Sequence, residues 1–184
     1  VMNGEQSVII EADDNVLQYV ITDVENGMLN VHYKSGVSFT NTHIKVRISA
    51  PVLNKLSIGG SGDITAKNVL KADRIEFKIS GSGDVEAEVD APSDNANISG
   101  SGTISLRGKA KDFNTSISGS GDIKCKELLS ENTTVSIAGS GTAHVFASVH
   151  LNAKVSGAGD IYYSGNPPSP EIRTSGAGSV QAEK

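Results

Sequence analysis

Ile117-Ser118-Gly119-Ser120-Gly121-Asp122-Ile123 decides the fold, because closely similar stretches occur seven times in the chain. The other six copies begin at Ile58, Ile79, Ile98, Ile137, Val155 and Thr174. Their first shared glycines, Gly60, Gly81, Gly100, Gly119, Gly139, Gly157 and Gly176, are 18 to 21 residues apart. Repeats of this length are typical of solenoids, in which each repeat forms one coil that stacks on the next.

Short runs of alternating polarity lie on both sides of each glycine-rich copy. Phe77-Lys78-Ile79 precedes one copy and Ile123-Lys124-Cys125 follows another, each with apolar outer members and a polar middle member. A period of two predicts strands with one buried face. Glycine allows positive φ and close backbone approach, so the copies themselves predict corners between strands. Cys125 is then expected to point inward as a buried, inert thiol.

A variable segment, such as Val89–Asn95 or Leu128–Thr133, completes each repeat and gives every coil a third side. We therefore predict an all-β fold, a right-handed parallel β-helix of about seven coils over residues 56–184. In this arrangement Ile79, Ile98 and Ile117 stack one above another.

Residues 1–55 lack the repeat and are predicted to form a mostly antiparallel β cap that merges into the solenoid as one continuous unit. Asn26-Gly27 lies between the β-prone runs Val16–Val24 and Met28–Tyr33, which indicates a hairpin. A cover is needed because the open edge of a first coil would recruit other chains.

Composition and charge exclude several classes of protein. The net charge of −5, with scattered lysines, is unlike the clustered basic face of a nucleic-acid-binding protein, so no nucleic-acid partner is predicted. One cysteine excludes a framework of internal disulfides. No apolar run approaches the roughly 18 residues of a membrane-spanning helix, and no cofactor is predicted. Because a strand pattern starts almost at Val1, we expect that an export signal or a lipid anchor has been removed, and such an anchor would be the only membrane attachment.

An aspartate follows the second shared glycine in four copies, at Asp63, Asp84, Asp122 and Asp160. Only Asp63 and Asp84 lie on neighbouring coils, so they are the weak candidates for a metal site. Calcium needs six to eight oxygen ligands. Thr or Ser replaces the aspartate in the other copies, and all three residue types bond to turn backbone. We therefore predict structural turn caps and no calcium requirement.

No catalytic residues are predicted from the repeats. Enzymes that cleave polysaccharides bring two carboxylates together in a cleft. The coils of this chain are short and carry no long insertion that could form such a cleft. A carbohydrate-active β-helix enzyme, either a polysaccharide lyase or a hydrolase, is the alternative hypothesis. It would require two carboxylates about 5–10 Å apart in a cleft.

His144, Phe146 and Tyr162 are the candidate partner-binding residues, because the alternation predicts that they project outward on neighbouring coils. Exposed aromatic side chains can stack on sugar rings or anchor a protein, unless loops cover them. The last coil, which contains Val180, has only four residues after it. Its open edge predicts association with another copy through the C-terminal coil.

The Ile-Ser-Gly-Ser-Gly-Asp corner, together with Gly27-Met28-Leu29-Asn30-Val31 and Ala50-Pro51-Val52-Leu53-Asn54-Lys55-Leu56, resembles the bacterial family described as putative auto-transporter adhesin, head GIN domain. The resemblance extends over most of residues 4–183. It implies a β-solenoid exported to the cell envelope, on the outer surface or in the periplasm, often behind a lipoprotein signal, and it supplies no catalytic residues. The leading hypothesis is a non-enzymatic surface or envelope protein that presents a rigid face to an unidentified glycan or protein.

Overall fold

The chain divides into two units in the computed structural model, which describes residues 1–37, 39 and 42–183. One unit is formed by residues 5–49, and the other by residues 1–4 together with the chain from residue 50 onward. The seven glycine-rich copies all lie in the second unit. The predicted boundary near residue 55, and the covering of the first coil, stay predictions.

The unit of residues 5–49 is built from antiparallel strands and one short helix. Its elements are β2 (Ser7–Glu11), α1 (Asp14–Leu17), β3 (Val20–Glu25), β4 (Met28–Tyr33) and β5 (Lys45–Ala50). Strand β2 pairs with β5, and β3 pairs with β4. The β3–β4 turn holds Asn26 at φ 52° and Gly27 at φ 77°, as a two-residue hairpin turn requires. The hairpin predicted at Asn26-Gly27 is confirmed.

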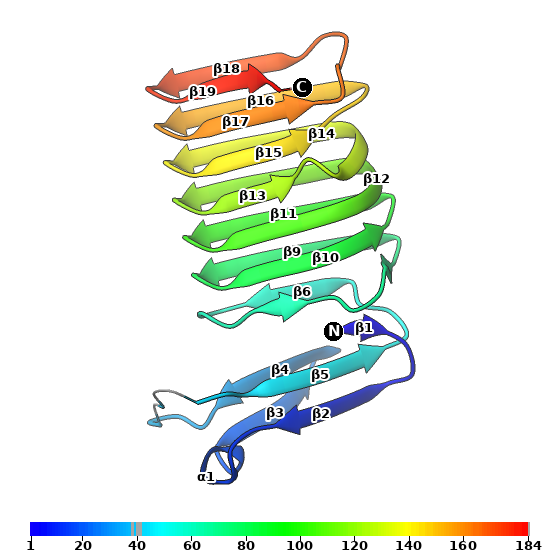
Figure 1. The fold of residues 1–184 in the computed structure, drawn as a ribbon, viewed down its shortest axis with the longest axis vertical. Coiled ribbons are helices and arrows are strands. Elements are labelled where there is room, and N and C mark those ends of the chain that lie inside the picture. The colour runs from blue at the N-terminus through cyan, green and yellow to red at the C-terminus, as the bar shows by residue number, and fades with distance from the viewer. Residues whose placement is uncertain (38, 40–41, 184) are drawn as a thin grey trace. The chain divides into compact units, whose positions relative to one another are not determined.

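The second unit is a stack of parallel strands (Figure 1). The stacked strands in chain order are β6 (Lys55–Ile58), β7 (Ile64–Thr65), β8 (Leu70–Lys71), β9 (Arg74–Gly81), β10 (Asp84–Asp90), β11 (Ser93–Gly100), β12 (Thr103–Gly119), β13 (Asp122–Cys125), β14 (Leu128–Gly139), β15 (Thr142–Phe146), β16 (His150–Gly157), β17 (Asp160–Ser164), β18 (Glu171–Gly176) and β19 (Ser179–Ala182). Strand β1 (Met2–Asn3) belongs to this unit but not to the stack. Strands that precede a glycine corner form the first wall, and strands that follow one form the second wall. The predicted parallel β-solenoid of about seven coils is confirmed.

The register of the first wall follows the repeat. Ile79 pairs with Ile98, Ile98 with Ile117, and Ile117 with Ile137. The predicted isoleucine column is therefore confirmed. A shorter third side is also present, where Leu70, Val89, Gly108 and Leu128 pair on successive coils.

The core is a narrow column between the walls. Alternate residues of the central strands are buried, as in β11 and β13, and most of these are Ile, Val, Leu or Ala. The largest fully buried side chains are Phe77 and Phe113. A column of this kind explains how a chain with only 4% aromatic residues buries its apolar surface.

Glycine is required at the corners because successive coils touch there through their backbones. Gly139 has φ 140°, and a Cβ at this position would overlap the carbonyl oxygen of Gly119 on the preceding coil. Gly60, at the same position of the first copy, has open space where a Cβ would lie, with no heavy atom within 4 Å, and its φ is not positive. A corner therefore requires glycine only where a preceding coil lies against it.

The first three residues belong with the solenoid. The Val1 amino group donates a hydrogen bond to the Thr65 carbonyl oxygen at 2.7 Å, and the Lys67 N–H donates to the Val1 carbonyl oxygen at 2.9 Å. Asn3 and Asn68 exchange two hydrogen bonds of 2.9 Å. The sequence placed these residues in the cap, because no repeat marks them. In the part of the chain that the structure describes, no helix is long and apolar enough to cross a membrane.

Candidate functional site

The outer surface of the second wall carries chemically varied side chains in register. Glu86, Ser105, Lys124 and His144 pair on successive coils, followed by Tyr162 and Gln181. They alternate along their strands with buried residues such as Leu106, Cys125 and Val145. The period of two predicted this alternation of outward and inward side chains, and the burial pattern confirms it.

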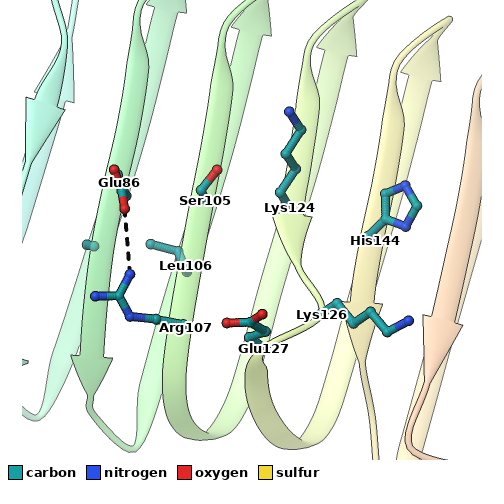
Figure 2. A pocket seen from close by; sticks show the side chains of 9 residues that line it. Glu86, Ser105, Leu106, Arg107, Lys124, Lys126, Glu127 and His144 are labelled. Carbon is teal, nitrogen blue, oxygen red and sulfur yellow. Dashed lines mark ion pairs between the residues drawn. The ribbon is translucent and has the colours of Figure 1, made fainter.

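A shallow groove of about 330 Å³ crosses this surface. Figure 2 shows its charged and polar rim on strands of the second wall and on the bend that follows β13. The rim residues are Glu86, Ser105, Arg107, Lys124, Lys126, Glu127 and His144, and the floor includes Ala87 and Leu106. The sequence predicted the outward side chains but not the hollow between them.

Ion pairs fix one side of the groove. Arg107 Nη1 lies 3.6 Å from Glu86 Oε1, and Arg107 Nε lies 3.1 Å from Glu88 Oε2. These side chains are about half exposed, so each pair stabilises the fold by less than about 1 kcal/mol. Lys124 makes no ion pair with any residue that the structure describes, which leaves its ammonium group available to a bound molecule.

His144 and Tyr162 lie together at the C-terminal end of the groove. Their rings stack with centroids 4.8 Å apart and planes 15° apart. His144 Nδ1 lies 3.2 Å from Glu183 Oε2, and Lys126 Nζ lies 3.5 Å from Glu183 Oε1. Glu183 thereby links the end of the chain to two earlier coils. Sequence reasoning missed it, because Glu183 follows the last copy and is 39 residues from His144.

Phe146 is the third residue that the sequence placed in this patch. It lies two residues after His144 on β15 and pairs in register with Ser164, so it does not join the ring stack. Its carbonyl oxygen accepts hydrogen bonds from the buried hydroxyls of Ser130 and Thr133 at 2.5 and 2.6 Å. All three predicted side chains are half-buried on the second wall, and their role in binding stays a prediction.

Three of the four aspartates of the repeat, Asp63, Asp84 and Asp160, accept hydrogen bonds from the next coil. Asp63 Oδ1 accepts a hydrogen bond from the Asp84 N–H at 3.1 Å, and Asp84 Oδ1 accepts one from the Thr103 N–H at 2.9 Å. Asp160 does the same for Ser179 at 2.9 Å. The carboxylates therefore cap the backbone of the following turn. Among the residues described, no three His, Cys, Asp or Glu side chains are grouped so that they could hold a metal ion.

We expect calcium to be unnecessary for folding, because the Asp63 and Asp84 carboxylates are already engaged by backbone N–H groups. Adding a chelator should change the melting temperature by less than about 3 °C, and adding calcium should not raise it. Differential scanning calorimetry of the purified protein measures both effects. A larger loss on chelation would contradict the expectation, and Asp63→Asn and Asp84→Asn would then identify the ligands.

Cys125 lies in the core, as the sequence predicted, and is fully buried. Burial raises the pKa of its thiol to about 12. The thiol is therefore protonated at neutral pH and is a poor nucleophile or metal ligand.

The last coil has an open side. Among the strands of the described chain, β18 pairs only with β16, and β19 pairs only with β17. Ile172 of β18 is 42% exposed. Association of two copies through this coil stays a prediction.

Known proteins resemble this chain in fold and sequence. The family profile described as "Putative auto-transporter adhesin, head GIN domain" matches residues 2–167. A solved putative adhesin from Bacteroides fragilis is 24% identical, with a TM-score of 0.95, over 99% of this chain and 86% of that one. A putative adhesin from Parabacteroides distasonis is 28% identical, with a TM-score of 0.74, over 99% of this chain and 88% of its own.

A third solved structure carries a different functional description. A putative lipid binding protein from Parabacteroides distasonis is 27% identical, with a TM-score of 0.74, over 100% of this chain and 88% of its own. No curated protein sequence matches this chain. The resemblance expected from the glycine corners is confirmed.

Proposed function

This chain belongs to the family described as putative auto-transporter adhesin, head GIN domain, and from that premise we propose that it is a non-enzymatic binding protein of the cell surface or envelope. Its second wall is the binding face, and its partner is a glycan or a protein. The observation that carries the proposal is the stacked His144–Tyr162 pair beside a groove rimmed by charged side chains.

The geometry of this face suits a surface-bound partner better than a small molecule. The groove is open and shallow, and its residues come from strands locked into a parallel stack. A rigid face loses little conformational entropy on binding. The ring of Tyr162, held parallel to His144, offers a platform for a sugar or an aromatic side chain, and Lys124 offers a cation close by.

A polysaccharide lyase or hydrolase is less well supported by the same surface. A second hollow, of about 400 Å³, is lined by Asp63, Asp84 and Glu86. Each of these carboxylates is engaged, Asp63 and Asp84 with backbone N–H groups and Glu86 with Arg107. Catalytic carboxylates must instead be free to reach the glycosidic bond and a water molecule. We therefore expect no release of reducing ends or unsaturated sugars from polysaccharides.

We place the protein outside the cytoplasm, in the envelope or on the surface. The family description supports this location. A lipid anchor ahead of the described chain is the membrane attachment that we expect, and globomycin-sensitive processing of the full-length precursor would reveal it.

Binding should depend on the His144–Tyr162 pair. A glycan array and a panel of surface proteins would identify partners of the wild-type protein. For a partner found in this way, His144→Ala with Tyr162→Ala should weaken affinity at least about ten-fold, because the platform is lost. Surface plasmon resonance measures the change.

The matched control lies on the first wall, where Lys78 and Thr134 are exposed. Lys78→Ala with Thr134→Ala should leave affinity unchanged within about two-fold. Equal losses in both double variants, or binding that survives the loss of His144 and Tyr162, would show that another face binds. A screen with no partner at all would contradict the binding role and favour a purely structural one.

A further inference from the structure

Asp94 occupies a core position that neighbouring coils fill with the uncharged side chains of Ile75, Phe113, Thr133 and Leu151. It lies on β11, which has β9 and β12 as its neighbours in the stack (Figure 1). Asp94 pairs in register with Ile75 of β9 and Phe113 of β12. Its exposed fraction is 0%. Neither carboxyl oxygen has a hydrogen-bond donor among the described residues. A carboxyl group so placed is unusual, because buried polar groups nearly always have a partner.

Among the described residues, the surroundings of Asp94 offer no compensating charge. The inward side chains of β9 and β12 on either side are Ile75, Phe77, Phe113 and Thr115, none of which titrates. The charged residues beside them, such as Glu76 and Asp112, lie at outward positions of their strands.

The opposite wall contributes one titratable group. Cys125 of β13 is buried, and the Asp94 charge adds to the rise of its thiol pKa. The inward residues of β10, Val85, Ala87 and Val89, are apolar. Asp94 therefore faces a neutral thiol and aliphatic side chains, so an ionised carboxylate there would have neither a cation nor a donor.

We propose that Asp94 is a buried proton switch, which keeps the middle coils closed while its carboxyl group is protonated and opens them locally to water when the group ionises. An unpaired carboxylate is so costly in an apolar core that water must reach it or the strands must part. Strands β11 and β12 are the elements that would respond.

The direction of the pH dependence follows from burial. Burial raises the pKa of Asp94 from 3.8 to about 7 in the folded protein. The folded state then binds one more proton than the unfolded state between those values, so stability falls as pH rises through this range. The stability that the protonated Asp94 carboxyl contributes to the folded state is fully present below about pH 4 and is lost by about pH 7. This is the reverse of the behaviour of a carboxylate held in an ion pair.

Two measurements test the switch. Carbon-13 NMR of the Asp94 side-chain carboxyl in the wild-type protein should show a titration midpoint above about pH 6. Asp94→Asn is neutral at every pH and has the shape of the protonated acid. We therefore compare the equilibrium constant for unfolding of the wild-type protein with that of Asp94→Asn. The ratio of wild type to variant should rise by between about ten-fold and about a thousand-fold from about pH 4 to about pH 7. Above about pH 7 the ratio should stay level.

The matched control is Asp73→Asn, which removes an exposed carboxylate just before β9. The ratio of the wild-type unfolding constant to that of Asp73→Asn should vary by less than about two-fold over the same pH range. A flat ratio for Asp94→Asn would overturn the proposal, and so would a carboxyl midpoint near the ordinary value. The NMR titration uses the wild-type chain, so it decides the question even if Asp94→Asn fails to fold.

Discussion

Gly139→Ala is expected to lower the melting temperature by about 5–20 °C, although it adds one methyl group. The residue has φ 140°, which side-chain-bearing residues rarely adopt, and the new Cβ would overlap the Gly119 carbonyl oxygen. Backbone strain of about 1–3 kcal/mol and overpacking of about 1–3 kcal/mol both act on the folded state. For a chain of this size, each kcal/mol shifts the melting temperature by about 2–4 °C. Circular dichroism melts measure the loss.

Gly60→Ala provides the matched control within the same motif. No heavy atom lies within 4 Å of a Cβ at Gly60, and its φ is not positive. The change should be neutral or should stabilise the protein by up to about 1 kcal/mol, because alanine restricts the unfolded chain. Similar losses at Gly60 and Gly139 would mean that coil stacking does not explain the glycines.

The sequence alone was sufficient to predict the coil stack. Gly81, Gly100 and Gly119 recur at one-coil spacing because each must lie against the backbone of the preceding coil, and this requirement fixes the register. With the corners fixed, the period of two decides which side chains point inward. The stacking of Ile79, Ile98 and Ile117 therefore follows from the repeat pattern by itself.

The sequence was weakest where a contact crosses several coils or breaks the repeat. Glu183 reaches His144 and Lys126 through side-chain length, which no local pattern encodes. Asp94 was assigned to the variable segment Val89–Asn95, which lies between the alternating runs of the repeat. The structure extends β11 back to Ser93 and turns Asp94 inward. The prediction that this segment forms the third side of the coil was wrong at its last three residues, which belong to β11 of the first wall.

The hollow beside Lys124 could not be predicted either. The period of two predicts that the rim side chain of Lys124 points outward, between the inward Ile123 and Cys125. The depth of the hollow depends on the bend of Lys126 and Glu127 away from β13, and this bend occurs where one repeat is longer than its neighbours. The pairing of Arg107 with two glutamates on the preceding coil depends on side-chain conformation. A repeat pattern determines neither the depth of the hollow nor the ion pairs of Arg107.

Ile117→Ala should destabilise the protein by about 2–5 kcal/mol, which corresponds to about 5–20 °C in melting temperature. The side chain is 1% exposed and packs in the first wall between Ile98 and Ile137 of the neighbouring coils. Truncation removes three buried carbons and leaves a cavity that a locked stack cannot close. Urea unfolding measures the free-energy change, and a single transition would show that the defect is shared along the column.

Ile172→Ala makes the same truncation on the last coil, and its result depends on what covers that coil. The side chain is 42% exposed, and its strand β18 pairs only with β16 among the described strands. For an isolated copy, the loss should be below about 1 kcal/mol, because little apolar surface is buried there. A loss as large as that of Ile117→Ala, with light scattering showing a dimer that the variant breaks, would mean that a second copy covers the coil. A small loss in a strictly monomeric protein would contradict association through this end.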